Sequence, residues 1–323
     1  MIEVAFVLMA YQSPLATATA RPDGPSALQP FAPADSNGAG YVPHRVYDTI
    51  HITIQRLRDL LADLKTADVV FLGEQHDDPG THRLEVAVLE GLARRRSNVV
   101  LALEMFERDV QPSLEEYLRG STSEPDFLAA SRPWLRYGTD YRPMVEFARA
   151  WHWRAIAGNV PRRIASLVAR RGLEGLDSLT SADRSLVARD IHCPHDEYFD
   201  RFAKTIGDMT GHSGAGAMTE EEKKAALERV YQAQCVKDET KGEAIATAFV
   251  AAPPRVLVVQ VSGAFHSNFR SGTASRAQQR LPGKRIVVVT FVPVADLDVA
   301  DGAPNRRIGD YIVFTLAPAT SKP

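Results

Sequence analysis

The sequence of 323 residues is poor in cysteine, with only Cys193 and Cys235. Two cysteines are too few for the disulfide framework of a small secreted domain, so an apolar core must hold the chain together. The composition supports such a core, because 45% of the residues are hydrophobic. The cysteines leave two states open: one bridge in an oxidising compartment, or two free thiols elsewhere.

The chain also lacks long apolar runs and a strong charge imbalance. After the N-terminus, no stretch approaches the roughly 18 continuous apolar residues of a membrane span. A formal net charge of -2 argues against a nucleic-acid partner, because phosphate binding usually needs a basic surface. We therefore expect no nucleic-acid partner, and membrane association only through the N-terminus.

Several motifs of catalysis and nucleotide binding are missing. The sequence contains no G-x-S-x-G nucleophile elbow, no P-loop, no G-x-G-x-x-G fingerprint and no H-E-x-x-H zinc helix. These absences disfavour hydrolysis through a serine nucleophile and nucleotide binding through the usual glycine-rich loops.

The N-terminus resembles part of a secretory signal peptide. The apolar run at residues 4–10 precedes Ala16-Thr17-Ala18, but a basic n-region is missing. Residues 21–43 are rich in Pro, Ala, Gly and Ser, which is typical of a linker. We expect a signal-like segment and linker at residues 1–43 and one domain at 44–323. An exported protein of the cell envelope or periplasm is the first interpretation, while a cytoplasmic location and the cleavage of the segment stay open.

Past the linker, short β-branched runs alternate with amphipathic runs of helical period. This alternation predicts an α/β fold, a mainly parallel sheet with helices on both faces. Residues 180–250 are helical in pattern, with a glycine-rich break at 211–216, and predict a helical cap over one end of the sheet. The predicted strands are 46–54, 69–72, 99–103, 154–158, 256–261, 286–291 and an edge strand at 311–314.

Ligand-capable side chains follow four of the predicted strands. Ligands of open parallel sheets bind outside the carboxyl ends of the strands, where these side chains should converge. We therefore predict one polar site. Its members are Glu74 and His76 after the strand at 69–72, Glu104 after 99–103, Asn159 after 154–158 and His266 after 256–261.

Each of these residues also has an ordinary explanation. Asn159 suits a turn, and a histidine beside a strand end is frequently only a satisfied loop residue. Glu104, between Leu103 and Met105, should be buried and so needs a partner such as Arg142 or Arg83. Two carboxylates and two histidines can hold a divalent metal, act as a general acid and base, or, with a tyrosine, ligate haem iron.

Several segments, agreeing in order and spacing, resemble the ChaN-like family of haem-binding uptake proteins. The wider superfamily includes the Tiki metalloproteases and the erythromycin esterases and shares two G-x-x-H motifs, here Gly73–His76 and Gly263–His266. The matching segments are VVFLGEQHDDPGTH at 69–82, ALEMFERDVQ at 102–111, Tyr141-Arg142-Pro143, AGNVPRRIASLVARRGL at 157–173, Lys237-Asp238-Glu239-Thr240 and VSGAFH at 261–266.

The resemblance implies a haem- or iron-binding protein of the cell envelope, with a second copy of the chain as one expected partner. The implied polar site comprises Glu74, His76, Glu104 and His266 in the catalytic position. Further ligand contacts would come from Asn159, Arg142, Tyr141 and Asp238.

The family also implies an alternative, a metal-dependent hydrolase. In it, His76, Glu104 and His266 would hold zinc or manganese, with Glu74 as general base on bound water. A metal-free hydrolase in which His76 activates water is a third interpretation.

The chain departs from the family pattern in two places. No lipobox cysteine follows the N-terminal run, and Lys241 stands where many relatives carry Met. Iron ligands could come from the cap histidines or from two tyrosines near the site, and an apolar slot from cap residues. These residues are His192, His195, His212, Tyr137 and Tyr141 for the iron, and Phe199, Phe202 and Met209 for the slot.

Overall fold

The computed structural model describes residues 41–210 and 219–317. It divides the chain into Met1–Tyr41 and Val42–Pro323, and the described helices and strands belong to the second unit. The apolar N-terminal run, most of the expected linker and the glycine-rich break at 211–216 lie outside the described residues. Within the described ranges, no helix combines the length and apolar character needed to cross a bilayer.

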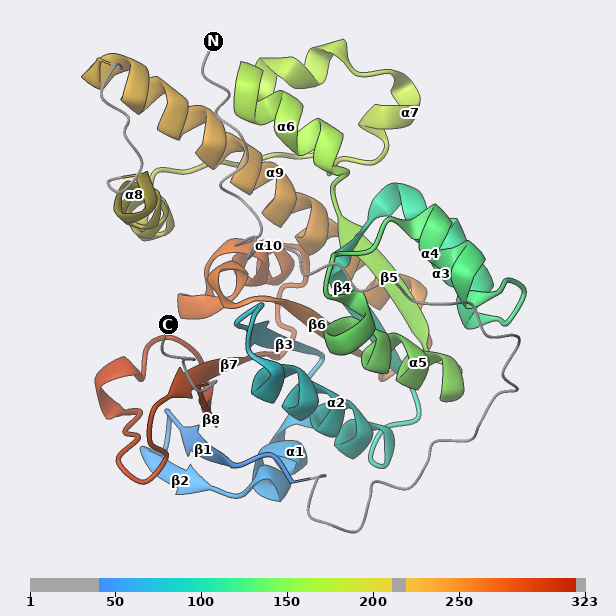
Figure 1. Ribbon diagram of the computed structural model, residues 1–323, viewed down its shortest axis with the longest axis vertical. Helices are drawn as coiled ribbons and strands as arrows, with labels where there is room; N and C mark the ends of the chain where they lie inside the picture. Colours follow the sequence, from blue (N-terminus) through green and yellow to red (C-terminus); the bar gives the residue numbers. More distant parts are fainter. Residues whose placement is uncertain (1–40, 211–218, 318–323) are drawn as a thin grey trace, which may run out of the picture. The chain divides into compact units, whose positions relative to one another are not determined.

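In the described part of the chain, eight strands form one mixed sheet in the order β2-β1-β8-β7-β3-β6-β4-β5 (Figure 1). The strands from β8 to β5 in this order are parallel to one another. Strand β1 pairs antiparallel with both β8 and β2. The α/β fold class predicted from the sequence is therefore confirmed. The strands are β1 (His44–Asp48), β2 (Thr53–Gln55), β3 (Val69–Glu74), β4 (Val99–Glu107), β5 (Arg154–Asn159), β6 (Leu257–Gly263), β7 (Ile286–Val294) and β8 (Tyr311–Leu316).

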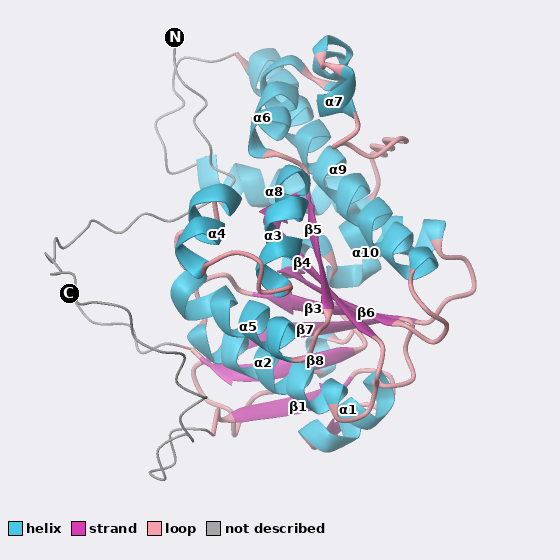
Figure 2. Ribbon diagram, turned by 90° about the vertical axis from the view of Figure 1, so that its right-hand side faces the viewer, coloured by secondary structure: helices cyan, strands magenta, loops and turns pink. Residues whose placement is uncertain are grey.

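Helices cover both faces of the sheet (Figure 2). Successive strand residues point to opposite faces, so one strand packs against both layers of helices. On β3, Val70 and Leu72 pack in the core cluster of helices α1 to α5, whereas Val69 and Phe71 pack in that of α9 and α10. The helices are α1 (Leu57–Leu64), α2 (Pro79–Ala93), α3 (Gln111–Leu118), α4 (Glu124–Ser131), α5 (Arg142–Ala150), α6 (Arg162–Arg171), α7 (Ser181–Arg184), α8 (Glu197–Thr210), α9 (Glu220–Ala251) and α10 (Gly272–Arg280).

Helix α9 takes part in two different layers. Toward its C-terminus, Ile245 packs in the apolar cluster on the sheet. Closer to its N-terminus, Val236 packs with Ile164 of α6, and Tyr231 packs with Tyr198 of α8. The expected cap at 180–250 thus includes a segment that covers the sheet face itself, and its residues 185–196 form no helix.

An N-terminal hairpin corrects two predictions. Residues 46–54 were expected to form one strand, but they are split between β1 and β2. The turn forms because a carboxylate oxygen of Asp48 accepts hydrogen bonds from the backbone N–H groups of Ile50 and His51, both at 2.9 Å. The hairpin pairs with β8, so the expectation that residues 311–314 form an edge strand is wrong.

Strand β4 is longer than its apolar run indicated. Its pairing with β6 stops at Leu103, while its pairing with β5 shifts register and resumes at Glu107. Glu104 therefore lies within an irregular part of the strand rather than after it. Such an irregularity re-aims side chains at the end of a sheet.

Candidate functional site

The predicted site residues come from four adjacent strands, β3, β6, β4 and β5. Glu74 is the last residue of β3, Asn159 is the last residue of β5, and His266 ends the short 3₁₀ turn that follows β6. Glu104 lies one residue beyond the last β4–β6 pair. The carboxyl ends of these parallel strands meet at one rim, as the sequence predicted.

Glu104 lies at the centre of a buried charge network. One carboxylate oxygen, Oε1, lies 2.9 Å from Lys241 Nζ and 2.9 Å from His266 Nε2, and Oε2 accepts the backbone N–H of Gly263 at 2.9 Å. Burial alone would raise the pKa of Glu104, but the charges of His266 and Lys241 hold it well below its usual range. Glu104 is therefore an anion whose lone pairs are already engaged.

His266 is held from both sides. Its Nδ1 lies 2.6 Å from Asp238 Oδ1, and Asp238 also accepts hydrogen bonds from Tyr198 at 2.6 Å and from Thr273 at 2.7 Å. Burial is the largest influence and lowers the pKa of His266, but Glu104 and Asp238 together raise it more, and the net shift is upward. Burial opposes ionisation of Asp238, yet His266 outweighs it and lowers the pKa of Asp238 to about 2. Two anions thus face two cations, His266 and Lys241.

This pairing bears on the expected metal site. A metal ion held by His76, Glu104 and His266 would have to displace the ammonium of Lys241, which already serves as the cation beside Glu104. It would also have to open the contact between His266 Nε2 and Glu104. Lys241 therefore meets the charge requirement of Glu104 without an ion.

Glu74 and His76 form a second part of the rim. Glu74 Oε1 lies 2.5 Å from His76 Nδ1 and accepts the hydroxyl of Tyr141 at 3.1 Å. The side chain of His76 is 47% exposed, whereas that of Glu74 is fully buried. Desolvation lowers the pKa of His76, but the contact with Glu74 raises it more. A ring contact with Trp134, at 5.2 Å between centroids, further orients the imidazole.

The remaining predicted residues have other contacts. Asn159 donates to the backbone carbonyl of Glu104 at 3.1 Å and accepts the N–H of Val160 at 2.9 Å, as a turn asparagine does. Arg142 binds both carboxylate oxygens of Glu124 on α4, at 2.5 and 2.8 Å. This ion pair holds α4 against α5, so Arg142 serves the packing of these helices rather than the rim.

Sequence reasoning missed a third group next to Glu74. His82 Nδ1 lies 3.0 Å from Glu85 Oε2 and 3.3 Å from Glu74 Oε2, and His82 Nε2 lies 3.6 Å from Asp140 Oδ2. Burial opposes the charge on His82, but Glu74 and Glu85 raise the pKa of His82 to about 11. Burial, with the charge of Glu74, raises the pKa of Glu85 to about 8. The available signal was the three-residue spacing of His82 and Glu85, which places both on one side of α2.

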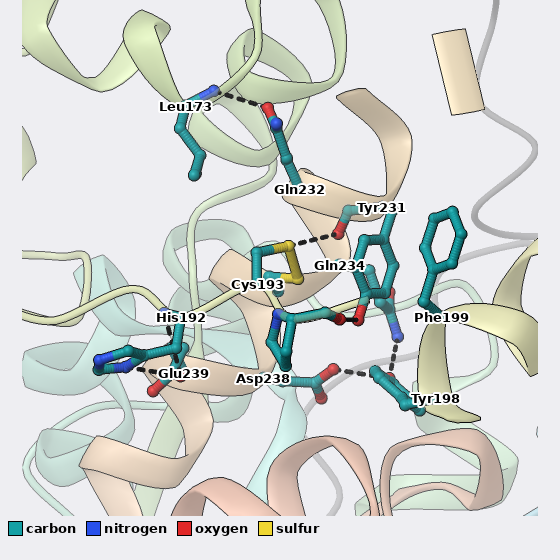
Figure 3. The surroundings of a disulfide bond; sticks show 12 residues. Leu173, His192, Cys193, Tyr198, Phe199, Tyr231, Gln232, Gln234, Asp238 and Glu239 are labelled. Atoms are coloured by element: carbon teal, nitrogen blue, oxygen red, sulfur yellow. Dashed lines mark hydrogen bonds and ion pairs between the residues drawn. A yellow bond between two sulfur atoms is a disulfide. The ribbon is translucent and has the colours of Figure 1, made fainter. Parts of the chain in front are cut away.

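The cap contains a disulfide bond and a group of aromatic rings beside the rim. Cys193 and Cys235 are bonded, which answers the question that the sequence left open (Figure 3). The bond ties residues 185–196 to α9, three residues before Asp238. His195 stacks on Phe199 with ring centroids 4.1 Å apart. The side chain of Met209 and all of His212, which were expected near the ligand, lie outside the described residues.

These features define an α/β protein with a buried acid–histidine–lysine network at the carboxyl ends of four parallel strands and a half-exposed histidine above it. Residues 60–277 match the model of a family described as haem-binding uptake, Tiki superfamily, ChaN. The match covers more than half of the chain, so the protein belongs to this family.

Several solved structures match this chain, and the one with a TM-score of 0.60 has the same fold. A structure reporting cofacial haem binding to ChaN of Campylobacter jejuni is 18% identical, with a TM-score of 0.60, covering 85% of this chain and 97% of that one. A Bacillus cereus protein matches at 15% identity and a TM-score of 0.39, covering 73% of this chain and 69% of that one. An erythromycin esterase EreC variant in its open conformation matches at 11% identity and a TM-score of 0.42, covering 77% and 76%. A comparison with curated proteins finds no match.

Proposed function

We propose that this protein binds haem on the aromatic surface of its cap, beside the polar rim. The observation that carries the proposal is the stacked pair of His195 and Phe199. The side chain of His195 is 54% exposed, and its ring lies parallel to that of Phe199 within 3°. A half-exposed imidazole next to a partly exposed aromatic ring offers both contacts that haem requires, an iron ligand and an apolar side chain for the macrocycle.

A continuous series of ring contacts runs from Phe199 to the rim through the interior of the cap, since Tyr231 and Tyr198 are only 0% and 3% exposed. Its far end is Phe265, the residue before His266, so packed rings connect the partly exposed Phe199 with the Glu104 network. Phe202, which was expected to line a slot, is only 3% exposed and serves as support beneath the surface. The contacts join Phe199 to Tyr231 at 4.9 Å, Tyr231 to Phe202 at 5.3 Å, Phe202 to Phe265 at 6.1 Å, and Phe265 to Tyr198 at 5.0 Å.

Family membership supports haem as the ligand and suggests how it is held. The Campylobacter jejuni relative is described as binding haem cofacially. We extend this arrangement to the present chain, with a second copy of the chain as the partner across the haem. A role in haem-iron uptake in the cell envelope follows from the same family, and the Cys193–Cys235 bond supports an oxidising compartment.

The direct test is a titration of the purified protein with haemin, followed by absorbance. We expect a saturable shift of the Soret band at micromolar haemin. Replacement His195→Asn should change the spectrum, because the axial ligand sets the electronic state of the iron. Replacement His76→Ala should leave the spectrum unchanged. A wild-type protein without a saturable change, or a His195→Asn protein with the wild-type spectrum, would contradict the proposal.

A second candidate, hydrolysis, rests on the Glu74–His76 pair. A buried carboxylate that fixes one ring nitrogen of a half-exposed histidine is the arrangement of a general base and its orienting group. In a metal-free hydrolase, His76 would take the proton of an attacking water molecule. Hydrolysis of a model ester by the wild type, lost in His76→Ala and retained in His195→Asn, would favour this candidate over haem binding.

A further inference from the structure

A closed group of ligand-capable side chains adjoins Glu74 on the side of helix α2. Glu74, His82 and Glu85 are 1%, 3% and 0% exposed. Each offers one ligand atom, and these atoms all lie within 4.8 Å of one another. They come from the end of β3 and from the first two turns of α2, so the group spans the turn that presents His76.

Two oxygens of this group have no hydrogen-bond partner among the described residues. They are Glu74 Oε2 and Glu85 Oε1. The other oxygen of Glu74 is engaged by His76 and Tyr141, whereas Oε2 has only the ion-pair contact with His82 Nδ1 at 3.3 Å. Burying carboxylate oxygens without a compensating donor or cation is costly. The group therefore needs a positive charge, which protonated His82 supplies in the metal-free protein and which a metal ion could supply in its place.

The orientation of His82 leaves one of its nitrogens available. His82 Nε2 lies 3.3 Å from the backbone carbonyl of His76, to which it can donate its hydrogen. When a metal ion displaces the proton of Nδ1, the lone pair of Nδ1 faces Glu74 and Glu85. Metal-binding histidines usually donate their second ring N–H to a carbonyl or carboxylate in this way.

The distances between the ligand atoms also suit a metal ion. His82 Nδ1 is 3.0 Å from Glu85 Oε2 and 3.3 Å from Glu74 Oε2. Ligands about 2.0–2.2 Å from one metal ion, at tetrahedral or octahedral angles, lie about 3–3.6 Å from each other. Little movement is needed for all three to coordinate one ion.

We propose that Glu74, His82 and Glu85 form a binding site for one divalent transition-metal ion, zinc or manganese. One imidazole and two carboxylates suit these ions better than magnesium or calcium, which prefer oxygen ligands alone. An ion of charge +2 balances the two carboxylates when His82 is neutral. By fixing Glu74, the ion positions His76 at the rim, where solvent begins.

This site differs from the metal site of the hydrolase alternative in its composition. That site would contain two histidines, His76 and His266, whereas the present one contains one. The proposal also does not depend on haem binding, because none of its three residues belongs to the aromatic surface of the cap.

The test is a titration of chelator-treated protein with zinc and with manganese, followed by calorimetry and thermal unfolding. For the wild type we expect one equivalent bound and a higher Tm on loading. Replacement Glu85→Gln should weaken binding at least tenfold and abolish the rise in Tm. Replacement Glu90→Gln is the matched control, because Glu90 lies on the same helix with a side chain that is 49% exposed and paired with Arg94, and it should bind as the wild type does.

If Glu85→Gln does not fold, a measurement on the wild type alone tests the ligands of the ion. X-ray absorption of the zinc-loaded protein should report one imidazole among nitrogen and oxygen ligands. Two imidazoles would move the ion to His76 and His266 and overturn the proposal. It would also be overturned by wild-type protein that binds neither ion, or by folded Glu85→Gln protein that binds as tightly as the wild type.

Discussion

Nε2 of His76 lies 2.7 Å from the position that a Cβ atom would occupy at Gly263. Only glycine leaves room for the imidazole there, since real Cβ atoms essentially never approach so closely. The N–H of Gly263 donates to Glu104, so one residue contacts both parts of the rim. The glycine of the other motif is equally close to its neighbour, since a Cβ at Gly73 would lie 2.9 Å from Ser267 Oγ. The two G-x-x-H motifs are thus packed against each other, which explains the need for both glycines.

Replacement Gly263→Ala should push the His76 ring away from Glu74. The pKa of His76 should then fall toward its ordinary value, because the contact with Glu74 is what raises it. Overpacking should cost about 1–3 kcal/mol of unfolding free energy. Titration of the His76 ring protons by NMR measures the shift. Gly138→Ala is the control, since a Cβ at Gly138 meets nothing within 4 Å. An unchanged His76 pKa in Gly263→Ala would contradict this explanation.

Replacement Lys241→Met should destabilise the fold by about 3–5 kcal/mol, because it leaves the buried carboxylate of Glu104 without its ammonium partner. Glu104→Gln removes the other charge, and the double variant should lose less stability than the sum of the two single variants. Urea unfolding of all four proteins completes the cycle. Losses that add within about 0.5 kcal/mol would show that the two residues act independently.

Reduction of the Cys193–Cys235 bond should lower the unfolding free energy by about 2–5 kcal/mol, because the bond closes a loop with a sequence separation of 42 residues. The Tm measured with a reductant should therefore be lower than the Tm without one. A double Cys→Ser variant should match the reduced protein and not respond to the reductant. If the oxidised and reduced wild-type proteins unfold at the same temperature, the bond contributes nothing.

Stability at acidic pH should depend on Asp238. The pKa of this carboxyl is lowered from 3.8 to about 2 in the folded protein. Its contribution is therefore fully present above pH 4 and is lost as the pH falls toward 2. The shift corresponds to roughly 2–3 kcal/mol. Urea unfolding between pH 2 and pH 5 should show a shallower pH dependence for Asp238→Asn than for the wild type. Equal slopes would mean that other carboxyl groups dominate acid unfolding.

Much of this architecture could be predicted because the signals are local. Apolar runs such as Val69–Leu72 are continuous where helices cover both faces of a strand, and they identify the parallel strands without any knowledge of their neighbours. The topology rule then places the residues after each run at one rim. Glu104 between apolar residues already indicated burial and the need for a partner.

The nature of that partner could not be predicted in the same way. Arg142 was one of the candidates from the sequence, but the structure pairs it with Glu124 and brings Lys241 to Glu104. Lys241 is 137 positions away in the chain, and its side chain meets Glu104 only because α9 crosses the face of the sheet. No periodicity within either segment contains that information.

The sequence by itself determined the class of fold, the family and the set of polar residues at the rim, because short-range patterns and motif spacing carry them. Tertiary structure alone decided that β1 and β2 cover the edge of β8, that Cys193 and Cys235 meet, and that His82 and Glu85 adjoin Glu74. Each of these depends on how separate elements pack. The free energy of such contacts arises from the burial and charge that two elements create together, and neither element's sequence specifies it alone.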